Sequence, residues 1–91
     1  MKVLMVEPGK SPYETEIEGG LESLQTAVGG DIQATYPFDD LVGLICNDEG
    51  KLMGLPLNRA LYDDGGRMYD IVAGNFLIVG LGEEDFTDLS P

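Results

Sequence analysis

The chain has 91 residues, of which 43% are hydrophobic and 24% charged, the composition of one small globular domain. Seventeen acidic residues against five basic ones give a formal net charge of −12, which repels nucleic acid phosphates and anionic membranes. A single cysteine and no histidine exclude an intrachain disulfide and a zinc site, and they leave no thiol–histidine pair for catalysis.

The first part of the chain predicts a strand, a helix and a second strand, separated by turns. Residues 2–6, KVLMV, are apolar enough for a short buried strand, and a polar connection follows over residues 10–18. Residues 20–28 predict an amphipathic helix that two glycines end, and residues 32–36 alternate like a half-exposed strand. The apolar face of this helix is predicted to consist of Leu21, Leu24 and Val28.

The middle of the chain predicts a buried strand over residues 41–47, LVGLICN. The turn NDEGK follows, and Gly50 is expected to take a positive φ there. Residues 51–57 are then expected to return antiparallel to the buried strand. Residues 58–61 form either a helical turn or an extension of the returning strand.

The last part of the chain predicts a turn, two strands and a helix-start signal. DDGG at residues 63–66 predicts the turn, and residues 69–72 and 76–79 predict strands. Gly74 lies between these strands and indicates a bulge or tight bend. Ser90 followed by Pro91 is typical of a helix start, so either a C-terminal helix is truncated after residue 89 or the signal is accidental.

This order of elements predicts one α+β domain over residues 1–91, in which a small, mostly antiparallel sheet of four to five strands has one helix packed on a face. No apolar run approaches the ~20 residues of a membrane helix, and the N-terminus lacks the features of a signal peptide, so we expect a cytoplasmic protein. The expected core residues are Val3, Met5, Ile32, Leu44, Cys46, Leu55, Leu57, Ile71, Phe76 and Ile78.

The residue types and spacings argue against catalysis and cofactors. Cys46 lies in an apolar strand without a histidine partner, and its simplest interpretation is a small buried hydrophobe. The acidic turns NDEGKL and DDGGRMYD lack the alternating acids and the later glutamate of a calcium loop. We therefore expect no enzymatic activity, no metal and no cofactor.

Asn58 and Arg59, within the apolar stretch GLPLNRAL, are the candidate ligand-binding residues, together with Arg67. A guanidinium near a pocket can hold a phosphate or a carboxylate through two parallel hydrogen bonds. The alternative, which the excess of acids favours, is that Arg59 pairs with an acid of its own chain from residues 63–70. In an alternating strand Asn58 and Arg59 would point to opposite faces, and a helical turn would separate them by about 100°.

Five segments together resemble a family of small uncharacterised domains: VEPGKSPYE, LESLQTAVGGDI, YPF, ICNDEGKLMGLPLNRAL and YDIVAGNFLIVG. The resemblance spans nearly the whole chain. Members of that family are frequent in phages and conjugative elements of Gram-positive bacteria. The resemblance implies a cytoplasmic accessory protein of a mobile element, and it implies neither a reaction nor site residues.

By analogy with other small proteins of mobile elements, we expect a non-enzymatic binding protein that acts in counter-defence. The leading hypothesis is that it sequesters a small host ligand, such as a nucleotide signal, in a pocket near Asn58 and Arg59. That pocket can lie in one chain or between the copies of a homo-oligomer. The alternative is an acidic protein–protein module that mimics DNA and blocks a DNA-binding host protein, which requires acids clustered on one face. Neither hypothesis involves direct binding of nucleic acid or of a membrane.

Overall fold

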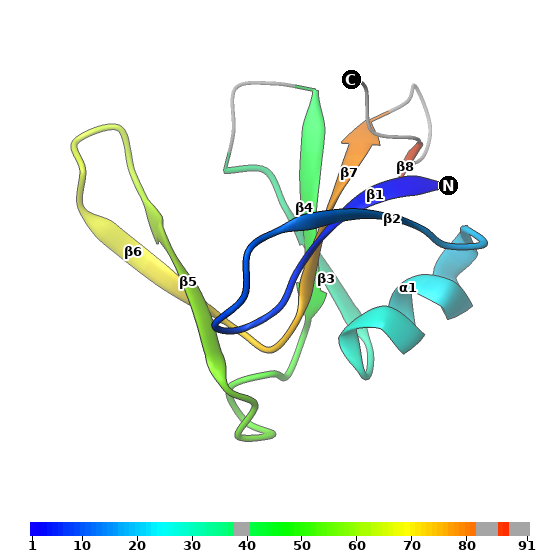
Figure 1. Ribbon diagram of the computed structural model, residues 1–91. Coiled ribbons are helices and arrows are strands. Elements are labelled where there is room, and N and C mark those ends of the chain that lie inside the picture. Colours follow the sequence, from blue (N-terminus) through cyan, green and yellow to red (C-terminus); the bar gives the residue numbers. More distant parts are fainter. Residues whose placement is uncertain (38–40, 82–85, 88–91) are drawn as a thin grey trace.

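A computed structural model describes residues 1–37, 41–81 and 86–87 of the chain (Figure 1). Its elements are β1 Lys2–Val6, β2 Tyr13–Glu16, α1 Gly20–Val28, β3 Ile32–Thr35, β4 Val42–Asn47, β5 Leu57–Tyr62, β6 Met68–Ala73, β7 Phe76–Leu81 and β8 Phe86–Thr87. The main sheet is antiparallel with the order β2-β1-β7-β4-β3, and the short β8 also pairs with β7. β5 and β6 form a separate two-stranded sheet. This arrangement confirms the predicted α+β class.

The two central strands of the main sheet, β4 and β7, are buried on both faces. The last five residues of β4 and the first five of β7 are buried. A strand that is covered on both sides has no wet face, and its sequence therefore lacks the polar alternation of an exposed strand. This is why both segments appear in the sequence as continuous apolar runs.

Alternate residues of the main sheet build two apolar cores, one on each face. On one face, Leu24 of α1 packs in a cluster with Val3, Ile45, Leu77 and Val79. On the other face, Leu61 and Val72 of the β5–β6 hairpin pack in a cluster with Val6, Leu44, Cys46, Phe76 and Ile78. Figure 1 shows the hairpin and α1 on opposite sides of the main sheet. The domain therefore has three layers: helix, main sheet and hairpin.

The helix has the bounds that its periodicity predicts. It ends at Gly29, whose φ of 80° is the left-handed conformation in which glycine is favoured. Leu24 and Val28 are buried as predicted, but Leu21 is 59% exposed, so its predicted packing is wrong. Leu24 and Val28 are one turn apart and define the contact face, whereas Leu21 lies in the first turn. Within the described residues, no helix has the length and apolar character needed to cross a membrane.

The prediction that residues 51–57 return as a strand antiparallel to β4 is wrong. Both edges of β4 are occupied, one by β3 and the other by β7, so β4 has no edge left for it. Residues 48–54 form turns instead, and β5 begins at Leu57 and pairs with β6. Leu57 was expected in the core and is 63% exposed.

Gly50 does not have the positive φ expected of it, and in this loop that conformation belongs to Gly54, with φ 71°. Gly50 is buried, and a Cβ at this position would lie 2.7 Å from the carbonyl oxygen of Ala73. Gly50 lets two backbone segments approach each other closely. The β4–β5 loop, residues 48–56, can pack against the end of β6 only because Gly50 has no side chain.

β2 lies within residues 10–18, which were predicted as a polar connection. It pairs with β1 in the register Lys2↔Glu16 to Met5↔Tyr13. Three of its four residues are exposed, because it is an outer strand of the main sheet. A strand with so little burial carries a weak hydrophobic signal. The helix-start signal at Ser90 lies outside the described residues.

Candidate functional site

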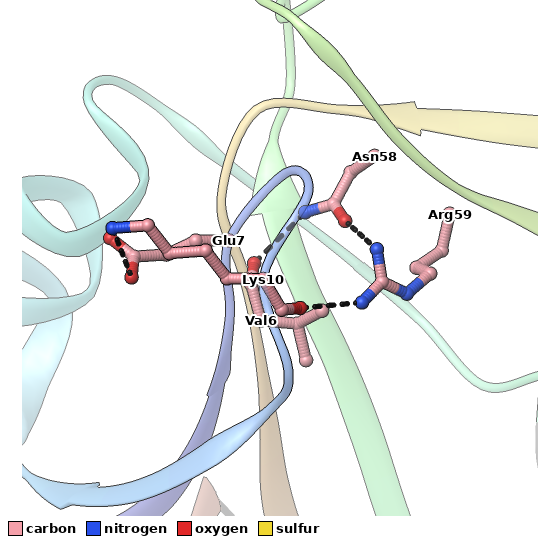
Figure 2. A network of polar contacts seen from close by, with 5 residues as sticks. All are labelled: Val6, Glu7, Lys10, Asn58 and Arg59. Carbon is pink, nitrogen blue, oxygen red and sulfur yellow. Dashed lines mark hydrogen bonds and ion pairs between the residues drawn. The ribbon is translucent and has the colours of Figure 1, made fainter.

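Asn58 and Arg59 lie on a β-bulge near the open end of the β5–β6 hairpin. Leu57 pairs with Ala73 and Ala60 pairs with Ile71, so β5 advances three residues where β6 advances two. A bulge of this kind changes the direction of side chains on the longer strand. Arg59 Nη1 donates a hydrogen bond of 3.0 Å to Asn58 Oδ1, and Figure 2 shows the two side chains side by side. Neither the alternating strand nor the helical turn considered from sequence describes this arrangement.

The amide of Asn58 is fully used inside the chain. Its Nδ2 donates to the carbonyl oxygens of Val6 and Gly74, each at 2.9 Å, and its Oδ1 accepts from Arg59. Val6 ends β1, and Gly74 forms the bend between β6 and β7 with a φ of 82°. Asn58 therefore ties the hairpin to the end of the main sheet.

Arg59 also bonds to the backbone of its own chain. Its Nη2 donates to the carbonyl oxygen of Lys10 at 2.7 Å, in the turn between β1 and β2 (Figure 2). Lys10 Nζ in turn lies 3.8 Å from Glu7 Oε2. Among the described residues, the guanidinium of Arg59 has no carboxylate partner, in contrast to the expected pairing with an acid of residues 63–70.

The acids expected to pair with Arg59 have other partners. Asp63 Oδ1 accepts the backbone N–H groups of Gly65 and Arg67, each at 2.9 Å, and so closes the hairpin turn. Asp70 pairs with Lys51. Arg67 lies at the tip of the hairpin, away from the bulge with Asn58 and Arg59. The structure therefore does not bring the three candidate ligand-binding residues together, and none of them lines either cavity described below.

A cavity of about 350 Å³ lies between the main sheet, the β4–β5 loop and β6, and we call it the hairpin cavity. Its floor includes buried apolar side chains, Cys46, Leu61 and Val72. Its rim includes the exposed apolar side chain of Leu52 and exposed polar side chains from β3, the loop and β6: Gln33, Asp48, Glu49, Lys51, Tyr69 and Asp70. An apolar floor with a few polar groups at the rim is the usual construction of a small-molecule site.

An ion pair between Lys51 and Asp70 joins the two walls of the hairpin cavity. Lys51 comes from the β4–β5 loop, and Asp70 comes from β6. The hydrogen bond from Lys51, together with one from the backbone N–H of Ile71, lowers the pKa of the Asp70 carboxyl below its ordinary value. Both side chains are about half exposed, so the pair is a weak connection between the walls.

Cys46 is buried, as its apolar context predicts, and it contributes to the cavity floor. Burial raises the pKa of its thiol, and the negative charges of Asp70 and Asp48 raise it further against the opposing charge of Lys51. The thiol is therefore protonated at neutral pH, when it is a poor nucleophile. Within the described ranges, no three acids or thiols converge in a way that could hold a metal ion.

Asn47, at the end of β4, holds the loop that forms one wall of the cavity. It is 5% exposed, its Nδ2 donates to the carbonyl oxygen of Val28 at 3.1 Å, and its Oδ1 accepts from the N–H of Glu49 at 2.8 Å. It thus connects the end of α1 to the start of the β4–β5 loop. A polar residue at the end of an apolar strand, as in LVGLICN, is the sequence signal for such a role.

The rim residues Tyr69 and Asp70 were not recognised from the sequence. They lie close to the β4–β5 loop only because β6 crosses the main sheet in a second layer, and no local pattern indicates this. Lys51 lies in residues 51–57, which were expected to form a strand and not the wall of a cavity. Their assignment to one cavity depends on the tertiary structure.

Comparison with known proteins gives a match to a family model. No curated protein and no solved structure matches the chain significantly. The model of the family described as "Domain of unknown function (DUF3846)" matches it over residues 1–91. Since that match covers the whole length, the chain belongs to the DUF3846 family.

Proposed function

We propose that this domain is a non-catalytic binding protein that holds a small organic molecule in the hairpin cavity. The observation that carries the proposal is the cavity itself, about 350 Å³ with an apolar floor and a polar rim. Ligand cavities of proteins start at about 300 Å³, so the space accommodates one small compound. The absence of histidine from the sequence and the raised pKa of the Cys46 thiol favour binding over catalysis.

The charges at the rim favour a neutral or cationic ligand. The rim carries the acids Asp48, Glu49 and Asp70, and Lys51 is already paired with Asp70. A phosphate group would therefore meet two unpaired carboxylates and a lysine whose charge is already compensated. These charges disfavour a nucleotide signal in this cavity.

The setting we propose is the one implied by the family resemblance: a cytoplasmic accessory protein of a phage or conjugative element that counters host defence by sequestering a small compound. The distribution of the acids does not favour the DNA-mimic alternative. That alternative requires acids on one face, whereas exposed acids lie on α1, as Glu22, and on the hairpin turn at the other side of the sheet, as Asp63 and Asp64.

The test is retention of a compound from a cell extract. The protein is incubated with a low-molecular-weight bacterial extract, separated by gel filtration and denatured, and the released compounds are identified by mass spectrometry. Thr35→Phe fills the hairpin cavity from β3. Thr15→Phe is the matched control, because Thr15 is also a half-buried residue of an outer strand but does not line this cavity.

We expect wild type and Thr15→Phe to retain the same neutral or cationic compound. Thr35→Phe should retain at least tenfold less of it. The retained compound should also slow alkylation of Cys46 by N-ethylmaleimide at alkaline pH, where the thiolate forms, since the thiol lies in the cavity floor. Equal retention by wild type and Thr35→Phe, or no retention by either, overturns the proposal. A retained compound that carries phosphate overturns the charge assignment.

A further inference from the structure

The outer edge of β2 is an open sheet edge. β2 pairs with β1 on one side, and no described strand lies on its other side. Met1 and Ile17 exchange backbone hydrogen bonds in both directions. In an antiparallel ladder, residue pairs that are hydrogen-bonded alternate with pairs that are not. The N–H and C=O groups of Glu14 and Glu16 therefore point away from β1. Two residues therefore present unused backbone donors and acceptors along this edge.

A groove runs beside this edge, between β2 and α1, and we call it the β2–α1 groove. Its volume is about 560 Å³, larger and more open than the hairpin cavity. Half-buried apolar side chains line it, among them Met5, Ile17 and Ala27. Hydroxyl groups of Thr15 and of the helix lie between them. An extended chain placed along β2 could direct alternate side chains into this groove.

The charge around the edge is negative. Glu14 and Glu16 lie on β2, and Glu18 and Glu22 line the groove, where the lining contains no lysine or arginine. Lys2, the cross-strand neighbour of Glu16, and the N-terminal ammonium of Met1 are the cations at this edge, so four acids stand against two cations. A second copy of the chain would bring the same acids to the edge, and the like charges would repel. The surface therefore matches a basic partner and not another copy.

We propose that β2 and the β2–α1 groove form a docking site for an extended, basic segment of a partner protein, which adds to the main sheet as a further strand. Backbone hydrogen bonds to Glu14 and Glu16 provide affinity. Small apolar side chains of the segment enter the groove over Met5 and Ile17, and the alternate lysine or arginine side chains lie on the opposite face against Glu14 and Glu16. Acidic side chains on a sheet edge also block unwanted pairing, and the experiment below separates that role from docking.

The probe is a fluorescein-labelled peptide of alternating lysine and valine, measured by fluorescence anisotropy at about 0.15 M salt, where long-range attraction is largely screened. A second peptide has proline in place of the central valines, which keeps the charge but removes backbone donors. The proposal expects the proline peptide to bind at least tenfold more weakly. Equal binding of the two peptides would show charge attraction without strand addition and overturn the proposal.

The matched protein variants are Glu14→Pro and Glu14→Gln. Both remove the same charge, but only proline removes the outward N–H, and an outer strand tolerates proline where that N–H faces solvent. We expect Glu14→Pro to bind at least tenfold more weakly than Glu14→Gln. Thr15→Phe, which fills the groove, should also weaken binding, whereas Thr35→Phe should bind like wild type. Equal affinity of the two Glu14 variants contradicts the proposal.

Hydrogen exchange of wild type gives a readout that does not depend on the folding of a variant. Bound peptide should slow exchange of the Glu14 and Glu16 amides in NMR spectra, because their N–H groups become hydrogen-bonded. The amides of Ile32 and Ala34, which by the same alternation face outward on β3, the opposite outer strand, should not change. Unchanged exchange at Glu14 and Glu16 with peptide bound refutes strand addition.

Discussion

At the residue scale, Asn58 is the side chain that fastens one sheet to the other. It satisfies two backbone carbonyl groups, of Val6 and Gly74, that come from different parts of the chain. It also accepts a hydrogen bond from Arg59, and Arg59 donates a second one to the carbonyl oxygen of Lys10. Both bonds are partly buried, and an average hydrogen bond contributes about 1 kcal/mol to stability. The hydrogen bonds of Asn58 therefore give it a structural role, and Arg59 extends the same connection to the β1–β2 turn.

Asn58→Ala should lower the free energy of unfolding by about 1–3 kcal/mol, because it removes two hydrogen bonds that join β5 to the backbone of Val6 and Gly74. Arg59→Ala should cost less, since its bond to Lys10 lies at the surface, and Arg67→Ala at the hairpin tip should change stability by less than about 0.5 kcal/mol. Urea unfolding of the three variants measures their free energies of unfolding and so tests this order of stability. Equal stability of Asn58→Ala and wild type would contradict a structural role for Asn58.

At the element scale, the segments that were predicted correctly from the sequence are those whose pattern is local. The helix over residues 20–28 has its own period and its own glycine stop, and β1 and β4 are uninterrupted apolar runs. The partner of β5 is not a local property, because the edges of β4 are taken by strands distant in sequence. The hairpin cavity could not be predicted for the same reason: its walls meet only once β6 lies over the main sheet.

The Lys51–Asp70 pair, which connects the β4–β5 loop to the hairpin, should make stability depend on pH. The folded state lowers the pKa of Asp70, so the pair stabilises the fold above the unfolded-state value of about 3.9. The contribution is lost as the pH falls through the lower pKa of the folded state. The difference in melting temperature between wild type and Asp70→Asn should therefore be small but present at pH 6 and should shrink towards pH 3. A difference that is constant over this range contradicts a charge contribution.

At the scale of the whole molecule, the three layers are small and the charge is large. The longest extent is 30 Å, and seventeen acids share this volume with five basic residues. In the part of the chain that the structure describes, the ion pairs include Lys10–Glu7 and Lys51–Asp70, each with at least one exposed member. Such pairs contribute little, so repulsion among the remaining acids is not offset locally. The fold therefore depends on its two apolar cores against an unfavourable electrostatic background.

Added salt should stabilise this domain. At about 0.01 M salt the Debye length is about 30 Å, as long as the molecule, and every acid acts on every other; at about 0.15 M it falls to about 8 Å and only near neighbours interact. We expect the melting temperature to rise by roughly 4–8 °C over this range, equivalent to about 1 kcal/mol for a domain of this size. Sodium and potassium chloride should act equally, since the effect depends on ionic strength. The double variant Glu18→Gln, Asp64→Asn removes two exposed acids and should start from a higher melting temperature with a smaller rise. A melting temperature that falls with salt would mean that ion pairs outweigh repulsion, despite the excess of acids.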